Sequence, residues 1–398
     1  MPQTNGNSKE LAFDLLSLRG GGGSVIRYSK LANHPRLALN AVCPYFTMFP
    51  LEFPIRVLRK HLEDRPVILD PFCGRGTTLF AARLFGLSAW GIDTSPVAVA
   101  VARAKLSIAR SDEVLELASN LMKLNPKALP TTPFFKKAYH PEVLRDICAI
   151  REGLLRLGSS ESADLLRAVM LGCLHGPKAK NLSGSGYFSN QMQRTFAPKP
   201  DYALRFWKAG EFRAPRISIQ DVIRRKAVRL DAQIFPVAGP PLQVIQGNSE
   251  LEATFNKIGE HPSVIITSPP YYGMRTYVQD QWLRNWFLGG PEEVDYTSGE
   301  QISHSSQENF VASLASVWDN IGHSKSQTLD LYLRIGQIPS RKVDALKLAK
   351  DSLKESVHNW KLVSVRSAKT ADEGKRQADH MSANSSAEKE FDLHAVRA

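Results

Sequence analysis

Short apolar runs of strand length alternate along the chain with segments of helical composition. The apolar runs, which are typical of buried strands, cover residues 67–69, 88–92, 242–246, 264–266 and 328–335. Helical composition is found at residues 96–106, 310–320 and 343–353. This alternation predicts a doubly wound α/β sheet, in which ligands bind beyond the carboxyl ends of the strands.

A glycine-rich turn follows the first of these predicted strands. Asp70 ends the strand, and Gly74 and Gly76 lie in the turn that leads into a helical segment. Glycine lets the backbone approach a ligand closely, and the N–H groups at a helix start can bind one. Asp93 ends the second strand about 20 residues later, where such folds bind ribose hydroxyls. The order of these elements favours a nucleoside-containing cofactor over an ordinary tight turn.

A rigid turn with an aromatic tip follows the strand at residues 264–266. Its sequence is Thr267-Ser268-Pro269-Pro270-Tyr271. The two prolines fix φ and remove two N–H donors, so backbone carbonyls are left as acceptors. Acceptors beside a ring suit the exocyclic amino group of a flat base. Taken alone, the turn is equally well a proline-stiffened cap on a core strand.

Together these motifs resemble those of the amino-group DNA methyltransferases, which use S-adenosylmethionine. The resemblance is carried by Asp-Pro-Phe-Cys-Gly-Arg-Gly-Thr-Thr at residues 70–78 and by Ser-Pro-Pro-Tyr at residues 268–271. Serine at the head of the second motif resembles the cytosine-N4 branch, because adenine-N6 enzymes more often carry Asp or Asn there. The resemblance implies a Rossmann-like methyltransferase sheet whose late strands, at 360–365 and 390–396, form an antiparallel edge.

The same resemblance implies a set of site residues. Residues 45–50 stand where the family places a segment that closes over the methionine part of the cofactor. Asn248 stands where the family commonly has Asp against the adenine, and it still offers a donor and an acceptor. The implied cofactor-binding residues are Phe46, Thr47, Asp70, Phe72, Gly74, Gly76, Thr77, Thr78, Asp93, Asn248 and Thr267.

The implied catalytic residues are Ser268, Pro269, Pro270 and Tyr271. In this interpretation the target base flips out of the duplex and stacks on Tyr271. The Ser268 side chain and the Pro269 carbonyl then accept hydrogen bonds from its amino group. Neither a metal nor a covalent intermediate is required.

The whole chain has a net charge of +12, and the positive charge is concentrated in its middle. Residues 175–230 hold twelve Lys or Arg against three acids, interleaved with seven aromatic residues. Basic residues suit phosphates and aromatics suit bases, so double-stranded DNA is the predicted partner. The alternative is a helical core with a solvated basic face. The predicted nucleic-acid contacts are Arg194, Lys199, Arg224, Arg225 and Lys226.

The cysteine pattern argues against other chemistries. The four cysteines are widely spaced, with no Cys-x-x-Cys pair, which is consistent with a reducing cytoplasm and predicts neither a disulfide framework nor a metal site. Cytosine-C5 methyltransferases need a nucleophilic cysteine just after a proline, and no Pro-Cys pair is present. No apolar run approaches the length of a membrane span. A cytoplasmic, nucleoid-associated bacterial protein is expected.

We expect four segments: a flexible lead-in at 1–40, a cofactor-binding half at 41–108, an inserted helical, basic DNA-recognition region at 109–240, and a catalytic half at 241–398. The predicted activity is methyl transfer from S-adenosylmethionine to the exocyclic N4 amine of cytosine at a specific DNA site. A cognate restriction enzyme is a candidate partner. Adenine-N6 methylation of DNA, methylation of RNA bases, and a catalytically inert DNA-binding protein of the same fold remain open alternatives.

Overall fold

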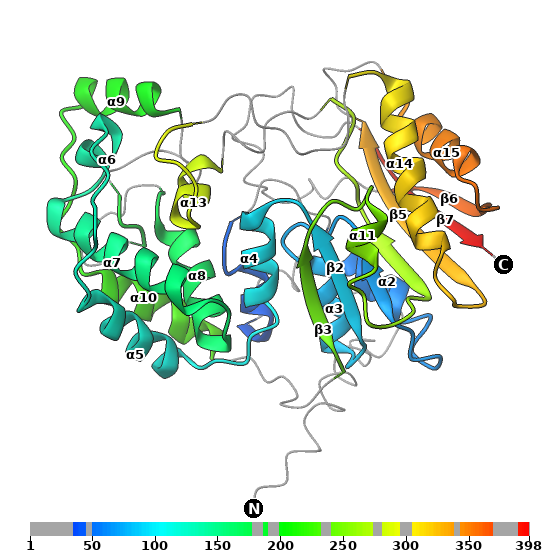
Figure 1. Ribbon diagram of the computed structural model, residues 1–398, viewed down its shortest axis with the longest axis horizontal. Coiled ribbons are helices and arrows are strands. Elements are labelled where there is room, and N and C mark those ends of the chain that lie inside the picture. The colour runs from blue at the N-terminus through cyan, green and yellow to red at the C-terminus, as the bar shows by residue number, and fades with distance from the viewer. Residues whose placement is uncertain are drawn as a thin grey trace, which may run out of the picture.

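A seven-stranded sheet forms the centre of the protein (Figure 1). The computed structural model describes residues 35–44, 50–176, 186–189, 199–231, 240–273, 281–294, 305–337, 343–368 and 389–397. The strand order is β3-β2-β1-β4-β5-β7-β6. The strands are β1 (Ile68–Asp70), β2 (Ala89–Asp93), β3 (Leu242–Gln246), β4 (Val264–Thr267), β5 (Leu329–Gln337), β6 (Lys361–Ala368) and β7 (Lys389–Arg397).

The first five strands are parallel, and the two late strands are antiparallel. β7 is inserted between β5 and β6, so β6 forms the edge of the sheet. Because the chain leaves β1 and returns to its other side as β4, the order of the strands reverses between these two neighbours. Open α/β sheets bind ligands at such a point. The fold is a doubly wound, Rossmann-like sheet, as predicted, with the expected antiparallel edge.

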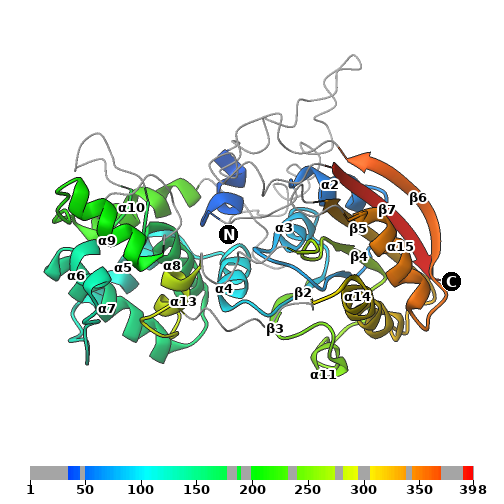
Figure 2. The same ribbon diagram turned by 90° about the horizontal axis from the view of Figure 1, so that it is seen from above.

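Helices cover both faces of the sheet (Figure 2). Ile68 and Ile266 belong to the apolar core on one face, whereas Leu69 and Ile265 belong to the core on the other. This alternation follows from the period of two in a strand. The helices around the sheet are α2 (Glu52–Leu58), α3 (Thr77–Leu84), α4 (Pro96–Ala104), α11 (Glu252–Phe255), α14 (Gln307–Gly322) and α15 (Ala345–Glu355).

A second group of helices lies beside the sheet, as the sequence predicted for the middle of the chain (Figure 1). It comprises α5 (Ser111–Met122), α6 (Pro133–Ala138), α7 (Pro141–Leu157), α8 (Glu161–Cys173), α9 (Pro200–Ala209), α10 (Ile219–Ala227) and η4 (Val228–Leu230). α13 (Trp282–Phe287) joins this group from a distant part of the sequence. It does so through Trp282. The centre of the Trp282 ring lies 4.8 Å from the ring centre of Phe134 and 6.0 Å from that of Phe135.

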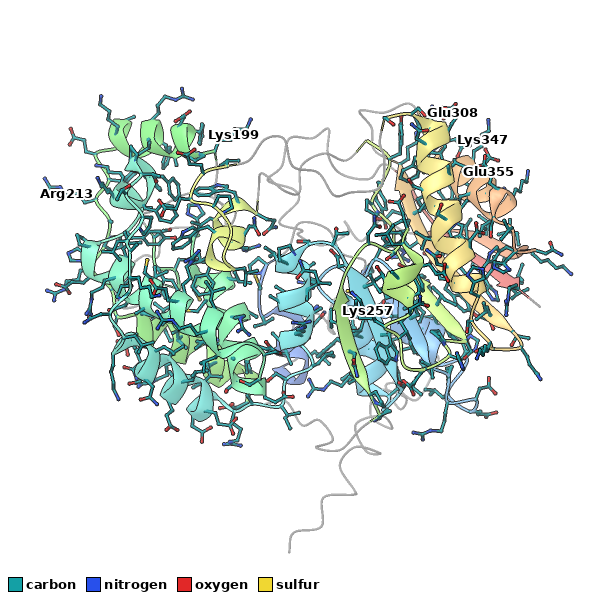
Figure 3. The ribbon with its side chains drawn as sticks, viewed as in Figure 1. Lys199, Arg213, Lys257, Glu308, Lys347 and Glu355 are labelled. Carbon is teal, nitrogen blue, oxygen red and sulfur yellow. The ribbon has the colours of Figure 1, made fainter. Side chains whose placement is uncertain are left out.

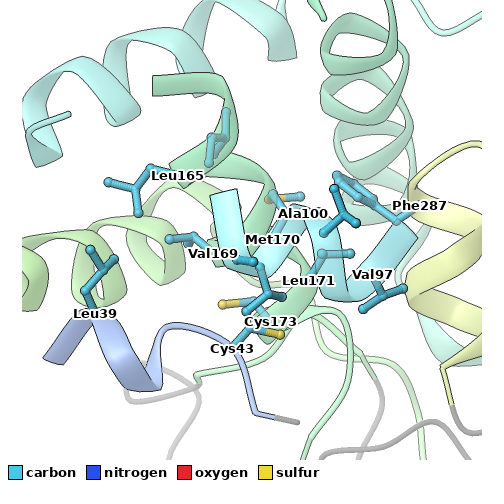
Figure 4. Packing of buried hydrophobic residues seen from close by; sticks show 14 of the residues in the cluster. Leu39, Cys43, Val97, Ala100, Leu165, Val169, Met170, Leu171, Cys173 and Phe287 are labelled. Atoms are coloured by element: carbon cyan, nitrogen blue, oxygen red, sulfur yellow. The ribbon is translucent and has the colours of Figure 1, made fainter. Parts of the chain in front are cut away.

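The second group of helices shares one apolar core with the sheet and its helices (Figure 4). α4 provides the connection, because it packs on β2 and β3 and also on α8. Val97 and Ala100 of α4 and Leu165 and Met170 of α8 belong to the same buried cluster. Seven of the nine residues of α4 are buried, which its small and β-branched side chains allow. The helical region is therefore packed onto the sheet.

One prediction needs correction. Residues 35–40, expected in a flexible lead-in, form most of the 3-10 helix η2 (Pro35–Ala41), because Leu37 and Leu39 are buried against the core. Among the aromatic residues of the basic segment, Phe188 and Trp207 are fully buried, so for them the core interpretation is correct. No helix in the described part of the chain is long and apolar enough to cross a membrane.

The glycine turn after β1 gives the first prediction. Gly76 has a φ of 73°, and a Cβ built there would lie 2.8 Å from the Cβ of Ala102. Gly74 has a φ of 49°, but a Cβ there would meet nothing within 4 Å. We expect Gly76→Ala to lower the free energy of unfolding by about 2–4 kcal/mol, from backbone strain plus overpacking. Gly74→Ala should cost only about 1 kcal/mol, from backbone strain alone. Urea unfolding measures both, and equal losses would contradict the packing role of Gly76.

Candidate cofactor and catalytic site

Hydrogen bonds join the tips of the first three strands at the carboxyl edge of the sheet. The N–H of Cys73 donates to the carbonyl of Ile92 at 2.9 Å, which ties the turn after β1 to β2. The hydroxyl of Ser249 donates to the carbonyl of Pro71 at 2.5 Å, which ties the turn after β3 to β1. These bonds hold three separate turns in one continuous rim.

Asp93 lies at the centre of this rim. Its Oδ2 accepts the N–H of Gly74 at 2.9 Å, and its Oδ1 accepts the N–H of Ser95 at 2.9 Å. Burial raises the pKa of Asp93 to about 6, although the two backbone bonds oppose the shift. Each carboxylate oxygen can accept a second hydrogen bond. Asp93 can therefore hold the glycine turn in place and still accept ligand hydroxyls.

The glycine turn can offer a ligand mainly backbone groups, because most of its side chains are buried. Gly74 is half-exposed and has open space beside it, whereas the side chains of Thr77 and Thr78 are buried. The hydroxyl of Thr78 donates to the carbonyl of Ile266 at 3.2 Å, so it bonds β4. Phe72 is half-buried and packs at the border of the second core. Of the predicted cofactor residues in this turn, only Phe72 and Gly74 are not buried.

Asn248 caps its own turn after β3. Its side-chain oxygen accepts the N–H of Glu250 at 2.9 Å, an Asx-type arrangement. The residue is half-buried, and no described residue accepts from its amide N–H groups. The position can therefore offer donors to a base, which an aspartate could not.

A buried hydrogen bond joins the two motifs. Thr267, at the end of β4, donates its hydroxyl to Oδ1 of Asp70 at 2.6 Å, and neither residue is exposed. The N–H of Phe72 donates to the same oxygen at 3.2 Å. Burial raises the pKa of Asp70 to about 7, although these hydrogen bonds oppose the shift. Both residues were predicted to bind the cofactor, but their side chains instead fix the two turns relative to each other.

The Ser-Pro-Pro-Tyr turn stands next to the glycine turn because β1 and β4 are paired. Ser268, Pro270 and Tyr271 are half-buried, and Pro269 is buried. The hydroxyl of Tyr271 donates to Oε1 of Glu390, on β7, at 3.1 Å. Burial, followed by the charge of Glu390, raises the pKa of Tyr271 well above its ordinary value. Sequence reasoning missed Glu390, whose single signal is an acid within a predicted strand.

The structure separates the predicted nucleic-acid residues. Lys199 is exposed and lies at the end of the molecule where α14 begins (Figure 3). Arg224 is exposed on α10, but Arg225 and Lys226 are half-buried. The Lys226 ammonium lies 5.2 Å from the ring centre of Tyr187, a cation–π distance. Phe46, Thr47 and Arg194 lie outside the described residues.

Metal and thiol chemistry find no support in the described part of the chain. No group of three or more His, Cys, Asp or Glu side chains there could hold a metal ion. All four cysteines are free and buried. Burial raises the pKa of each of these thiols, which disfavours the nucleophilic thiolate.

The buried Asp70 carboxyl predicts a pH effect on stability. Its pKa is higher in the folded than in the unfolded chain, so its contribution to stability is complete below about pH 4 and is lost as the pH rises through about 7. Asp70→Asn does not titrate. Between pH 5 and pH 8 we expect the unfolding free energy of wild type to fall by about 2 kcal/mol relative to the variant. Asp112→Asn, at an exposed position, is the control. A pH-independent difference for Asp70→Asn in urea unfolding would contradict the shift.

Comparisons with known proteins agree with the first motif. Residues 25–104 match the sequence profile of a family of N6- and N4-directed enzymes described as DNA methylases. The Type II methyltransferase M.MjaII of Methanocaldococcus jannaschii is 32% identical over 97 residues, which are 24% of this chain. The match spans 16% of the length of that relative.

Among solved structures, the rRNA methyltransferase aviRa from Streptomyces viridochromogenes aligns over 93% of each chain, with 14% identity and a TM-score of 0.34. The family match includes the glycine turn and Asp93 and ends before Ser268. Residues 25–104 of this chain are thus similar to the family of amino-group DNA methylases.

Proposed function

We propose that this protein is a site-specific DNA methyltransferase that uses S-adenosylmethionine and methylates the N4 amine of cytosine. The observation that carries the proposal is the pairing of β1 with β4, which sets the glycine turn beside the Ser-Pro-Pro-Tyr turn. The 2.6 Å bond from Thr267 to Asp70 holds the two turns together. A cofactor turn and an amine-binding turn at neighbouring strand ends are what a direct transfer between two bound reactants requires.

The rim around Asp93 fits a nucleoside cofactor. Asp93 retains acceptor capacity for ribose hydroxyls, Asn248 offers amide donors for the adenine, and Gly74 leaves open space for a close approach. Burial and the surrounding backbone bonds fix these groups in advance of binding. S-adenosylmethionine, bound at this rim, supplies an electrophilic methyl group.

The Ser-Pro-Pro-Tyr turn would prepare the amine. Tyr271 offers a ring on which an extruded base can stack. The Ser268 hydroxyl and the Pro269 carbonyl would accept hydrogen bonds from the amino group, which localises its lone pair on nitrogen. Serine at position 268, where adenine-N6 enzymes more often carry Asp or Asn, is the reason to favour cytosine.

α9 supports a DNA interface that differs from the predicted one. Tyr202, Arg205 and Lys208 are exposed at helical spacing along it, on the side away from the buried Trp207. Lys199 precedes the helix, at the end of the molecule towards which β5 points (Figures 1 and 3). These groups form what we call the α9 stripe: Lys199, Tyr202, Arg205 and Lys208. It stands on the same side as the strand tips, where duplex DNA would have to lie.

Such an enzyme would act on DNA at the nucleoid, within the cytoplasm. A restriction enzyme of the same sequence specificity would be its functional partner, since methylation at one site protects DNA from cleavage there.

The product identifies the reaction. In a host without cytosine-N4 methylation, expression should place N4-methylcytosine at one short DNA sequence, and mass spectrometry of digested nucleosides reads this directly.

Ser268→Ala should lower the transfer rate about 10- to 100-fold, because the amine loses an acceptor that acts in the transition state. Its affinity for S-adenosylmethionine in calorimetry should not change. N6-methyladenine in DNA, or a methylated base in RNA, would replace cytosine as the target; absence of cofactor binding would favour an inert DNA-binding protein.

The salt dependence of DNA binding tests the α9 stripe. Replacing Lys199, Arg205 and Lys208 together by Ala should reduce the slope of log K against log salt concentration by about 2–3, because each phosphate contact contributes about 0.9. The control replaces three exposed lysines outside α9: Lys257, which lies far from Lys199 in Figure 3, Lys354 on α15 and Lys361 on β6. Equal slopes for the two triple variants would show that the stripe does not contact phosphates.

A further inference from the structure

Glu390 is a buried acid that reaches the catalytic turn from an unexpected element. It lies near the start of β7 and pairs with Gly336, close to the end of β5. Its side chain is 4% exposed, and its Oε1 accepts the hydroxyl of Tyr271 at 3.1 Å. The other oxygen, Oε2, is buried and has no hydrogen-bond partner. The bond to Tyr271 is therefore the one side-chain hydrogen bond that the described structure gives this carboxylate.

A neighbouring cation offsets the burial of Glu390. Arg334 on β5 is also 4% exposed and donates from Nε and Nη2 to the two oxygens of Asp392, at 2.7 and 2.9 Å. Its guanidinium lies 4.5 Å from the ring centre of Phe53. Arg334 attracts both acids electrostatically. A buried carboxylate without a cation nearby would be costly, so Arg334 offsets part of the cost of burying Glu390 beside Tyr271.

The bond to Glu390 decides how the Tyr271 hydroxyl is used. A phenol has one proton, and here it points to Glu390. The bond therefore anchors the hydroxyl end of the Tyr271 ring.

We infer, building on the proposed function, that Glu390 is a positioning residue for methyl transfer: through the hydroxyl of Tyr271 it fixes the ring on which the target base stacks. Glu390 itself does not touch the base. Without it, the ring would lose its anchor at the hydroxyl end, and the stacked base would be less well aligned with the methyl donor.

Single-turnover methylation by full-length variants tests this role. Glu390→Leu removes the acceptor and should lower the transfer rate about 10- to 100-fold, the size of effect that misplaced reactive groups produce. Tyr271→Phe keeps the ring and should lose a similar factor. The transfer rate of the double variant should lie within about threefold of the rate of the slower single variant, because both substitutions break the same contact. Glu390→Gln keeps an acceptor oxygen and should restore most of the rate.

Three controls separate positioning from damage to the fold. Lys389→Ala changes the exposed neighbour on β7 and should match wild type. Affinity for S-adenosylmethionine by calorimetry should change little in Tyr271→Phe, and urea unfolding should show that each variant is folded under the assay conditions. Wild-type rate in Glu390→Leu, or full additivity of the two single losses, would overturn the inference. Absence of methylation by wild type would instead reject the proposed function, and the positioning role with it.

Discussion

The hydrogen bond between Thr267 and Asp70 is the contact on which the candidate site depends. It crosses between neighbouring strand ends and is completely buried, so water does not compete for either partner. The carboxyl has a pKa near neutrality because it is desolvated, yet it keeps the turn after β1 in place through the N–H of Phe72. The glycine turn and the Ser-Pro-Pro-Tyr turn thus have a defined spacing before any ligand arrives. Pre-organisation of this kind reduces the ordering that binding would otherwise require.

A second constraint acts on the opposite side of the catalytic turn. Tyr271 is bound at its hydroxyl by Glu390, and the charge of Glu390 is offset by Arg334. The turn is therefore held from β1 on one side and from β7 on the other. The antiparallel pair at the sheet edge contributes to the site as well as closing the sheet, because β7 places Glu390 beside the end of β5.

Much of the fold could be predicted from local pattern. Each apolar strand run, the acid that ends it and the glycine turn are contiguous in sequence. These elements can therefore be predicted without knowledge of tertiary contacts. Asp93 and Asn248 were placed at the rim for the same reason. Glu390 could not be predicted, because its role depends on pairing between β5 and β7 and on a partner about 120 residues away in sequence, at Tyr271. For Trp207 the sequence left both a core role and a DNA contact open, and the structure shows it fully buried.

The basic residues of the middle segment fall into two groups that differ in burial. Those at the end of α10 lie in its last turn, where cations interact favourably with the helix dipole. Two of them are half-buried and contribute to packing, as Lys226 does against Tyr187. Those of the α9 stripe are exposed, so they remain accessible to a polyanion. Both groups carry positive charge, so composition alone cannot show which residues are buried and which are exposed.

The packing of α4 bears on how the helical region could change in evolution. The small side chains of α4 fit between the sheet and α8, and the helical region shares a continuous core with the sheet. A region joined by linkers could be exchanged whole between relatives, but here an exchange would have to replace complementary surfaces on both sides of α4 at once. Under the proposed function, a new target would therefore be more accessible through single substitutions at exposed positions than through the transfer of the region as a cassette.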